Sequence, residues 1–204
     1  MSGSRVLATA TWNDIYKLTE AGRRELANQV GSYRWDDLRM PVTGINPPGQ
    51  ISDPDIDATD GNFLFDDSAT ELIYIKAQMP HAWKEGSELR PHIHWEQAAS
   101  GNVLWQLDYK FFNNGDTIPA LWTTIQSTDQ VFTYASGTIA QISPLPSIHV
   151  TTMGISAILK MKLSRIGGDA SDTMSGDASM TDFDIHFQSD DRGSEREYTK
   201  TNAA

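Results

Sequence analysis

The clearest pattern along the chain is a strict alternation of apolar and polar residues over short segments. In residues 103–111 every second side chain is large and apolar, and several of those between are polar. A β-strand points successive side chains to opposite faces, so this segment is predicted to be a strand with one buried and one wet face. Weaker forms of the pattern predict strands at residues 71–79, 91–97, 121–126, 130–135, 138–142, 153–165 and 182–188.

These segments are separated by turn signals and show no alternation of strands with helices, which favours an antiparallel sheet. The predicted fold class is all-β, with residues 68–189 forming a jelly-roll-type β-sandwich. In the strand at 153–165 the residues expected to point inward are Ile155, Ala157, Leu159, Met161 and Leu163. A duplicated Gly-Asp-Ala-Ser, at 168–171 and 176–179, is predicted to form a mobile surface loop.

The N-terminal third has a different character. Residues 11–30 carry apolar residues near helical spacing, which predicts a short helix. From Trp35 to Asp67 the chain is rich in Pro, Gly and Asp and shows neither period, so an extended arm is expected across its own domain or a neighbouring subunit. The predicted organisation is therefore a helix and arm over 1–67, the sandwich over 68–189 and a polar tail over 190–204.

Composition narrows the function classes. The net charge of −11 argues against binding nucleic acid, because neutralising phosphates needs clustered basic residues. No apolar run reaches the ~20 residues that span a bilayer, so no membrane association is expected. The absence of cysteine removes disulfides, thiolate ligands and a thiol nucleophile. No cofactor and no enzymatic activity are predicted.

A His-x-His pair offers one chemical alternative. Period-2 geometry places His92, His94 and Glu96 on one strand face, and two imidazoles with a carboxylate are a credible ligand set for a transition metal. Their spacing from Gly86 resembles the first half of the cupin motif, whose later half is missing. The structural alternative is that both histidines pair with Glu96, or with a neighbouring strand such as that of Lys160 and Lys162.

Aromatic residues offer a second alternative, since exposed tryptophans stack on sugar rings in carbohydrate-binding modules. Trp95 and Trp105 share the apolar faces of their strands and are predicted to lie in the core. The other four tryptophans and Phe63 are candidate subunit-interface anchors, and Trp83 and Trp122 are also candidate sugar platforms. These interaction candidates are Trp12, Trp35, Phe63, Trp83 and Trp122.

Several phrases of the sequence resemble a family of small structural proteins of tailed bacteriophages and prophages. The phrases are Trp35-Asp36-Asp37-Leu38-Arg39, Pro80-His81-Ala82-Trp83-Lys84-Glu85-Gly86-Ser87 and Pro91-His92-Ile93-His94-Trp95. The resemblance implies a jelly-roll virion component, such as a capsid decoration protein, a head-fibre base or a neck collar protein. It also implies a non-enzymatic homo-oligomer, with a trimer favoured, that is made in the host cytoplasm and docks on other virion proteins.

Overall fold

The computed structural model describes residues 34–45, 47–128, 130–190, 193–194 and 197–198. The chain divides into two compact units, Met1–Arg34 and Trp35–Ala204, and the second contains the folded domain described below. The helix predicted over residues 11–30 lies outside the described residues, as does Trp12. Within the described residues, no helix is long and apolar enough to cross a membrane.

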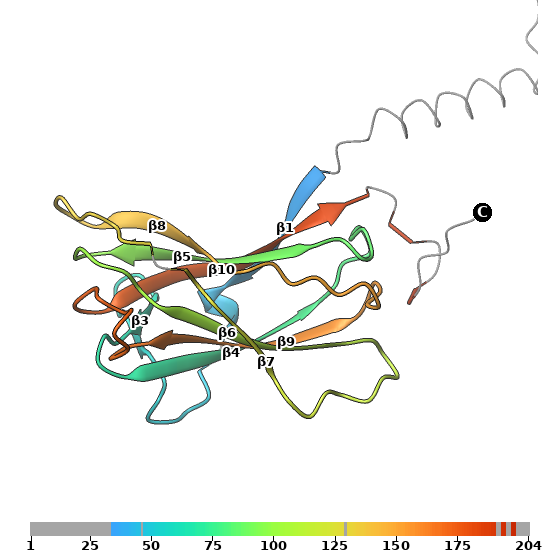
Figure 1. The fold of residues 1–204 in the computed structure, drawn as a ribbon, viewed down its shortest axis with the longest axis horizontal. Coiled ribbons are helices and arrows are strands. Elements are labelled where there is room, and N and C mark those ends of the chain that lie inside the picture. Colours follow the sequence, from blue (N-terminus) through green and yellow to red (C-terminus); the bar gives the residue numbers. More distant parts are fainter. Residues whose placement is uncertain (1–33, 46, 129, 191–192, 195–196, 199–204) are drawn as a thin grey trace, which may run out of the picture. The chain divides into compact units, whose positions relative to one another are not determined.

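Two sheets form the domain (Figure 1). In the strand orders given next, each strand runs antiparallel to the strands beside it. The first, called sheet A, has the order β2 (Asp55–Ile56), β3 (Phe63–Phe65), β10 (Ala178–Ser189), β5 (Leu89–Gln97) and β8 (Ile139–Pro144), and β1 (Arg34–Pro41) also pairs with β10. The second, sheet B, has the order β4 (Thr70–Gln78), β9 (Ile158–Ile166), β6 (Trp105–Phe112) and β7 (Thr123–Gln126). A short 3-10 helix, η1 (Val42–Gly44), follows β1.

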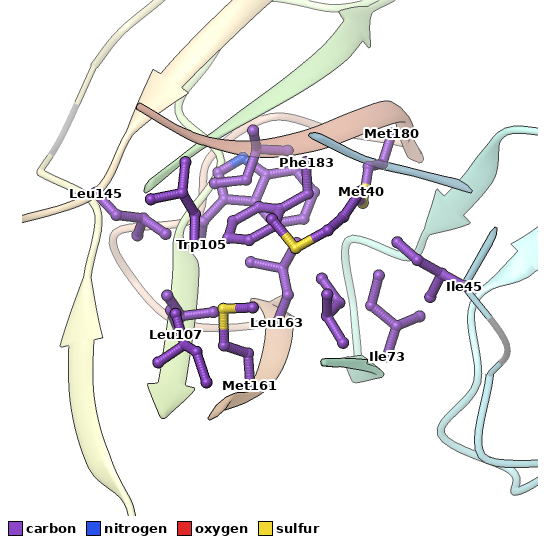
Figure 2. Close-up of a cluster of buried hydrophobic side chains, with 14 of the residues drawn as sticks. Met40, Ile45, Ile73, Trp105, Leu107, Leu145, Met161, Leu163, Met180 and Phe183 are labelled. Carbon is purple, nitrogen blue, oxygen red and sulfur yellow. The ribbon is translucent and has the colours of Figure 1, made fainter. Parts of the chain in front are cut away.

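The inner faces of the two sheets enclose one hydrophobic core. Phe183 and Met40 reach into it from sheet A, and Trp105 and Leu163 reach in from sheet B (Figure 2). Phe65 meets the Trp105 ring edge-on, with ring centroids 5.2 Å apart. This architecture confirms the predicted all-β, antiparallel jelly-roll-type sandwich, since alternate residues of each long strand fill the space between two layers.

The boundary predicted at residue 67 differs from the structure. Residues 35–67 belong to the same compact unit as the sandwich and supply β1, β2 and β3 to sheet A. Phe63 and Phe65 are fully buried in the core. The prolines and glycines interrupt the segment into strands of two to eight residues, and such short strands leave too few alternating positions to be recognised.

Two other predictions need correction. Residues 130–135 form a single bridge, Gly101 with Phe132, in place of a strand. The reason is that β8 already pairs with β5 as far as Gln97, so the earlier segment crosses the turn beyond the end of that strand. The remaining seven predicted strands correspond to β4 to β10.

The Gly-Asp-Ala-Ser loop is the second correction, because a buried arginine holds it in place. Arg165, on β9, donates to both carboxylate oxygens of Asp172 at 3.0 and 2.7 Å. It also donates to the carbonyl oxygens of Phe65, Met174 and Gly176 at 2.6–2.8 Å. The five N–H groups of the guanidinium thus match five acceptors, which fixes the loop against the end of the sandwich.

Candidate functional site

A cluster of histidine and aspartate side chains covers the outer face of sheet A where β5, β10 and β1 meet. His92 and His94 point outward from β5, because Ile93 and Trp95 take the inward positions. On β10, Asp184 lies directly opposite His92, and Asp182 opposite His94. This arrangement is called the His/Asp cluster below, and it consists of His92, His94, Asp182, Asp184 and His186 with Asp37 and Arg39 of β1.

A bulge in β10 helps to aim these side chains. The register between β5 and β10 shifts between Met180 and Asp182, leaving Thr181 as the extra residue. The Thr181 hydroxyl donates to the carbonyl oxygen of His94 at 3.1 Å. Bulges of this kind bend one strand and redirect its side chains. Here the shift leaves Asp182 and Asp184 on the outer face while Phe183 stays in the core.

Asp184 is the centre of the cluster. Its Oδ1 lies 2.5 Å from His92 Nε2, and its Oδ2 lies 3.3 Å from His94 Nε2. Both the His92 and the Asp184 side chains are only 7% exposed, so water screens this contact little. One carboxylate therefore ties two histidines of the neighbouring strand to β10.

The proton positions follow from the partners. The Nδ1 of His92 lies 3.3 Å from the carbonyl oxygen of Arg90, which can only accept a hydrogen bond, so Nδ1 carries a proton. Since Nε2 faces a carboxylate, a proton there as well makes the ring an imidazolium. Burial is the largest single influence on the pKa of His92 and would lower it, but hydrogen bonding and charge from Asp184, with smaller contributions from Arg90 and Asp37, together raise it. Burial would likewise raise the pKa of Asp184, and hydrogen bonding to His92 with the charges of His92, His94 and His186 together lower it.

Strand β1 extends the network at its rim. Asp37 Oδ1 lies 3.1 Å from His186 Nε2, and Arg39 Nη2 lies 2.5 Å from Asp182 Oδ2. A cavity of about 410 Å³ opens here, lined by Asp37, Arg39, His94, Thr181, Asp182 and Asp184. Residues from three strands thus line one polar depression that contains both acidic and basic groups.

The cluster can also be compared with a metal centre. His92, Asp184 and His186 offer ligand atoms that lie within 4.8 Å of one another. Two ligand atoms on a tetrahedral ion, each ~2.0–2.1 Å from it, stand about 3.3 Å apart. The 2.5 Å between His92 Nε2 and Asp184 Oδ1 is too short for both atoms to bind one ion. An ion would have to displace the ion pair, so the geometry fits a charge network better than a metal cradle.

We therefore expect metal to bind weakly. Protein purified without a polyhistidine tag should contain well under one equivalent of zinc, nickel, iron or manganese by elemental analysis. Added zinc should raise the melting temperature no more in the wild type than in a His186→Gln variant, because neither would hold the ion tightly. Stoichiometric metal that is lost on the His186→Gln substitution would contradict this assignment.

The metal ligands predicted from the sequence are placed as follows. His92 and His94 share the outer face, as the period-2 pattern predicts. Glu96, the proposed third ligand, lies further along β5, where it faces Ser179 and Ala140 across the sheet. The histidines pair with Asp184, and the suggested pairing with the strand of Lys160 and Lys162 is wrong because β9 belongs to sheet B.

The predicted interaction residues divide by burial. Phe63 and Trp83 are core residues, 2% and 1% exposed, so neither can be a surface anchor or a sugar platform. The indole N–H of Trp83 donates to Ser87 at 3.0 Å, which makes the Trp83 to Ser87 phrase a folded turn. Trp35 is 42% exposed and lies beneath Arg90, whose guanidinium is 4.4 Å from the ring centroid. Trp122 is half-buried and lies against Lys110 and Lys162, which point outward from sheet B.

Comparisons with known proteins add little to this picture. No protein-family model matches the chain, and no curated protein matches it. Among solved structures, it is similar to TmCBM61, a structure described as a complex with beta-1,4-galactotriose. That similarity covers 78% of this chain and 92% of the other, with 12% identity and a TM-score of 0.30. At this level it carries no argument about what the present chain binds.

Proposed function

We propose that this protein is a non-enzymatic structural component of a tailed-bacteriophage virion. In this role it assembles as a homo-oligomer, with a trimer favoured, and docks on neighbouring virion proteins. The proposal begins from the resemblance of the Trp35–Arg39, Pro80–Ser87 and Pro91–Trp95 phrases to phage structural proteins. It is supported by what these phrases do in the fold.

The phrases that carry the resemblance build the sandwich. Trp83 and Trp95 are buried, and the indole N–H of Trp95 donates to Ser143 of β8 at 2.9 Å. His92 is held in an ion pair with Asp184. Residues used in this way explain a shared structural scaffold, whereas an enzyme family would be expected to share a reactive group that is free to act.

Exposed aliphatic side chains are the observation that carries the docking role. Ile51 is fully exposed, and Leu121 and Val131 are 84% and 76% exposed. Removing large apolar side chains from water is favourable, so a complex in which a partner covers these loop residues would be stabilised by their burial. The outermost strands of both sheets, among them β8 and β7, also present edges that a second chain can pair with.

The experiment combines solution mass with location. Light scattering on the purified full chain should give three times the 22.6 kDa chain mass. Leu121→Asp and Ile51→Asp should each weaken assembly, because each places a charge where the partner covers an apolar side chain. Asp60→Asn, at an exposed position, is the control and should leave assembly unchanged. Mass spectrometry of purified phage particles should detect the protein. A stable monomer that is absent from particles would refute the proposal.

A further inference from the structure

Lysines are concentrated on the outer face of sheet B. Four of the chain's seven lysines lie there, on three adjacent strands, although the net charge of the chain is −11. They alternate with buried residues such as Met161, so their side chains point away from the core. This surface, called the lysine face, consists of Lys76 on β4, Lys160 and Lys162 on β9 and Lys110 on β6.

Three of these lysines form a row across the sheet. Lys160 lies directly opposite Lys76 on one side and directly opposite Lys110 on the other. Neighbouring strands are ~4.7–4.9 Å apart, and like charges placed directly opposite destabilise a sheet. Among the described residues, no carboxylate forms an ion pair with any of the three. The face thus maintains a repulsion that a bound anion would relieve.

The ammonium groups are held in place by aromatic rings. Lys110 and Lys162 each lie 4.8 Å from the centroid of Trp122, and Lys160 lies 5.5 Å from that of Phe112. Lys162 also forms a 2.8 Å ion pair with Asp108. Cation–π contacts restrict flexible side chains before a ligand arrives, which reduces the entropy lost on binding.

The groups beside the row indicate the class of ligand. Gln106, Gln126 and Thr124 lie on the same face, where they are hydrogen-bonded to one another and to Asp108. Each amide keeps a second N–H and the hydroxyl oxygen can still accept, so these groups can bind a ligand as well. Tyr74 exposes 44% of its surface on this face. Lysine is depleted in the cores of protein interfaces, so this composition does not favour a protein partner. The overall negative charge opposes the dense charge of a nucleic acid. A ligand that carries many hydroxyl groups and widely spaced negative charges fits this combination of lysines and neutral polar groups better.

We propose that the lysine face binds an acidic polysaccharide. Its carboxylate or sulfate groups would lie along the Lys76–Lys160–Lys110 row, while its hydroxyls bond to the neighbouring amides and Tyr74 receives an apolar sugar face. This binding goes beyond the structural role proposed above, and the face would act in the same way whether or not the chain belongs to a virion.

The test is affinity electrophoresis and calorimetry of the full chain with four probes: polygalacturonate, the sparsely sulfated κ-carrageenan, neutral dextran and single-stranded DNA. We expect the wild type to bind polygalacturonate or κ-carrageenan, with affinity falling as salt rises, and to show no binding to dextran. Lys160→Gln should weaken binding about tenfold, since it removes the central charged contact. The two acidic polysaccharides distinguish carboxylate from sulfate recognition, because polygalacturonate carries only carboxylates and κ-carrageenan only sulfates.

The matched control is Lys84→Gln, which removes the same charge from the turn before β5 and should leave binding unchanged. Lys160→Gln should also melt no lower than the wild type, because it relieves repulsion, so lost binding cannot be ascribed to unfolding. Absence of binding to both acidic polysaccharides, tighter binding to DNA than to either, or an equal loss in Lys84→Gln would overturn the proposal.

Discussion

Replacing Arg165 with methionine should destabilise the protein by about 3–5 kcal/mol, among the largest effects expected of any single substitution. The side chains of Arg165 and Asp172 are 0% and 1% exposed, so the variant leaves a buried carboxylate without its counterion. It also removes the donors to the carbonyl oxygens of Phe65, Met174 and Gly176. Urea denaturation followed by tryptophan fluorescence measures the change, since Trp105 lies in the nearby core.

Arg90→Met provides the matched control. The Arg90 side chain is 54% exposed in its ion pair with Glu88, and exposed pairs contribute about 0–1 kcal/mol. If Arg165→Met does not fold, Asp172→Asn gives a milder measurement, because the amide keeps one acceptor for the guanidinium. A loss below 1 kcal/mol in both Arg165→Met and Asp172→Asn would show that the loop is not held by this network.

The position of Arg165 shows where periodicity stops being informative. The alternation in β9 correctly places Leu159, Met161 and Leu163 inward, and Arg165 continues the same phase. A charged residue in an inward phase normally marks the end of a buried face, because burying an unpaired charge is costly. Its partner Asp172 lies in a polar loop with no sign of burial in the sequence. Only the folded structure shows that the two charges neutralise each other.

For a similar reason, the sequence predicts which residues of the His/Asp cluster share a strand face but not which strands lie side by side. Period-2 geometry puts His92 and His94 on one face of β5, and it puts Asp184 and His186 on one face of β10. Nothing in the sequence says that these strands are neighbours, because about 90 residues separate them. Glu96 is the third ligand that the sequence predicts, because it continues the same face of the strand two residues after His94. Strand pairing across the sheet instead supplies Asp184.

Replacing Asp184 with asparagine should lower stability by about 2–3 kcal/mol at pH 5.5, where His92 is charged. The amide keeps the shape of the carboxylate but cannot neutralise the buried imidazolium. Asp37→Asn is the matched control, because it makes the same change in the ion pair between Asp37 and His186. The side chains of His186 and Asp37 are 43% and 50% exposed, so this substitution should lower stability by less than about 1 kcal/mol. Equal losses in the two variants would refute a special role for Asp184.

The pH dependence separates the charge effect from simple loss of packing. The pKa of His92 is raised above its ordinary 6.5, so its contribution is complete below that value and is lost as pH rises through the folded-state pKa. The pKa of Asp184 is lowered below its ordinary 3.8, so its contribution is present above that value and is lost as pH falls through the folded-state pKa. The pair therefore stabilises the wild type most between about pH 4 and 6.5.

Asp184→Asn should remove this maximum, and the difference in stability from the wild type should shrink towards pH 8, where an unpaired His92 loses its proton. A difference that stays constant from pH 5 to pH 8 would mean that the two side chains interact as neutral groups.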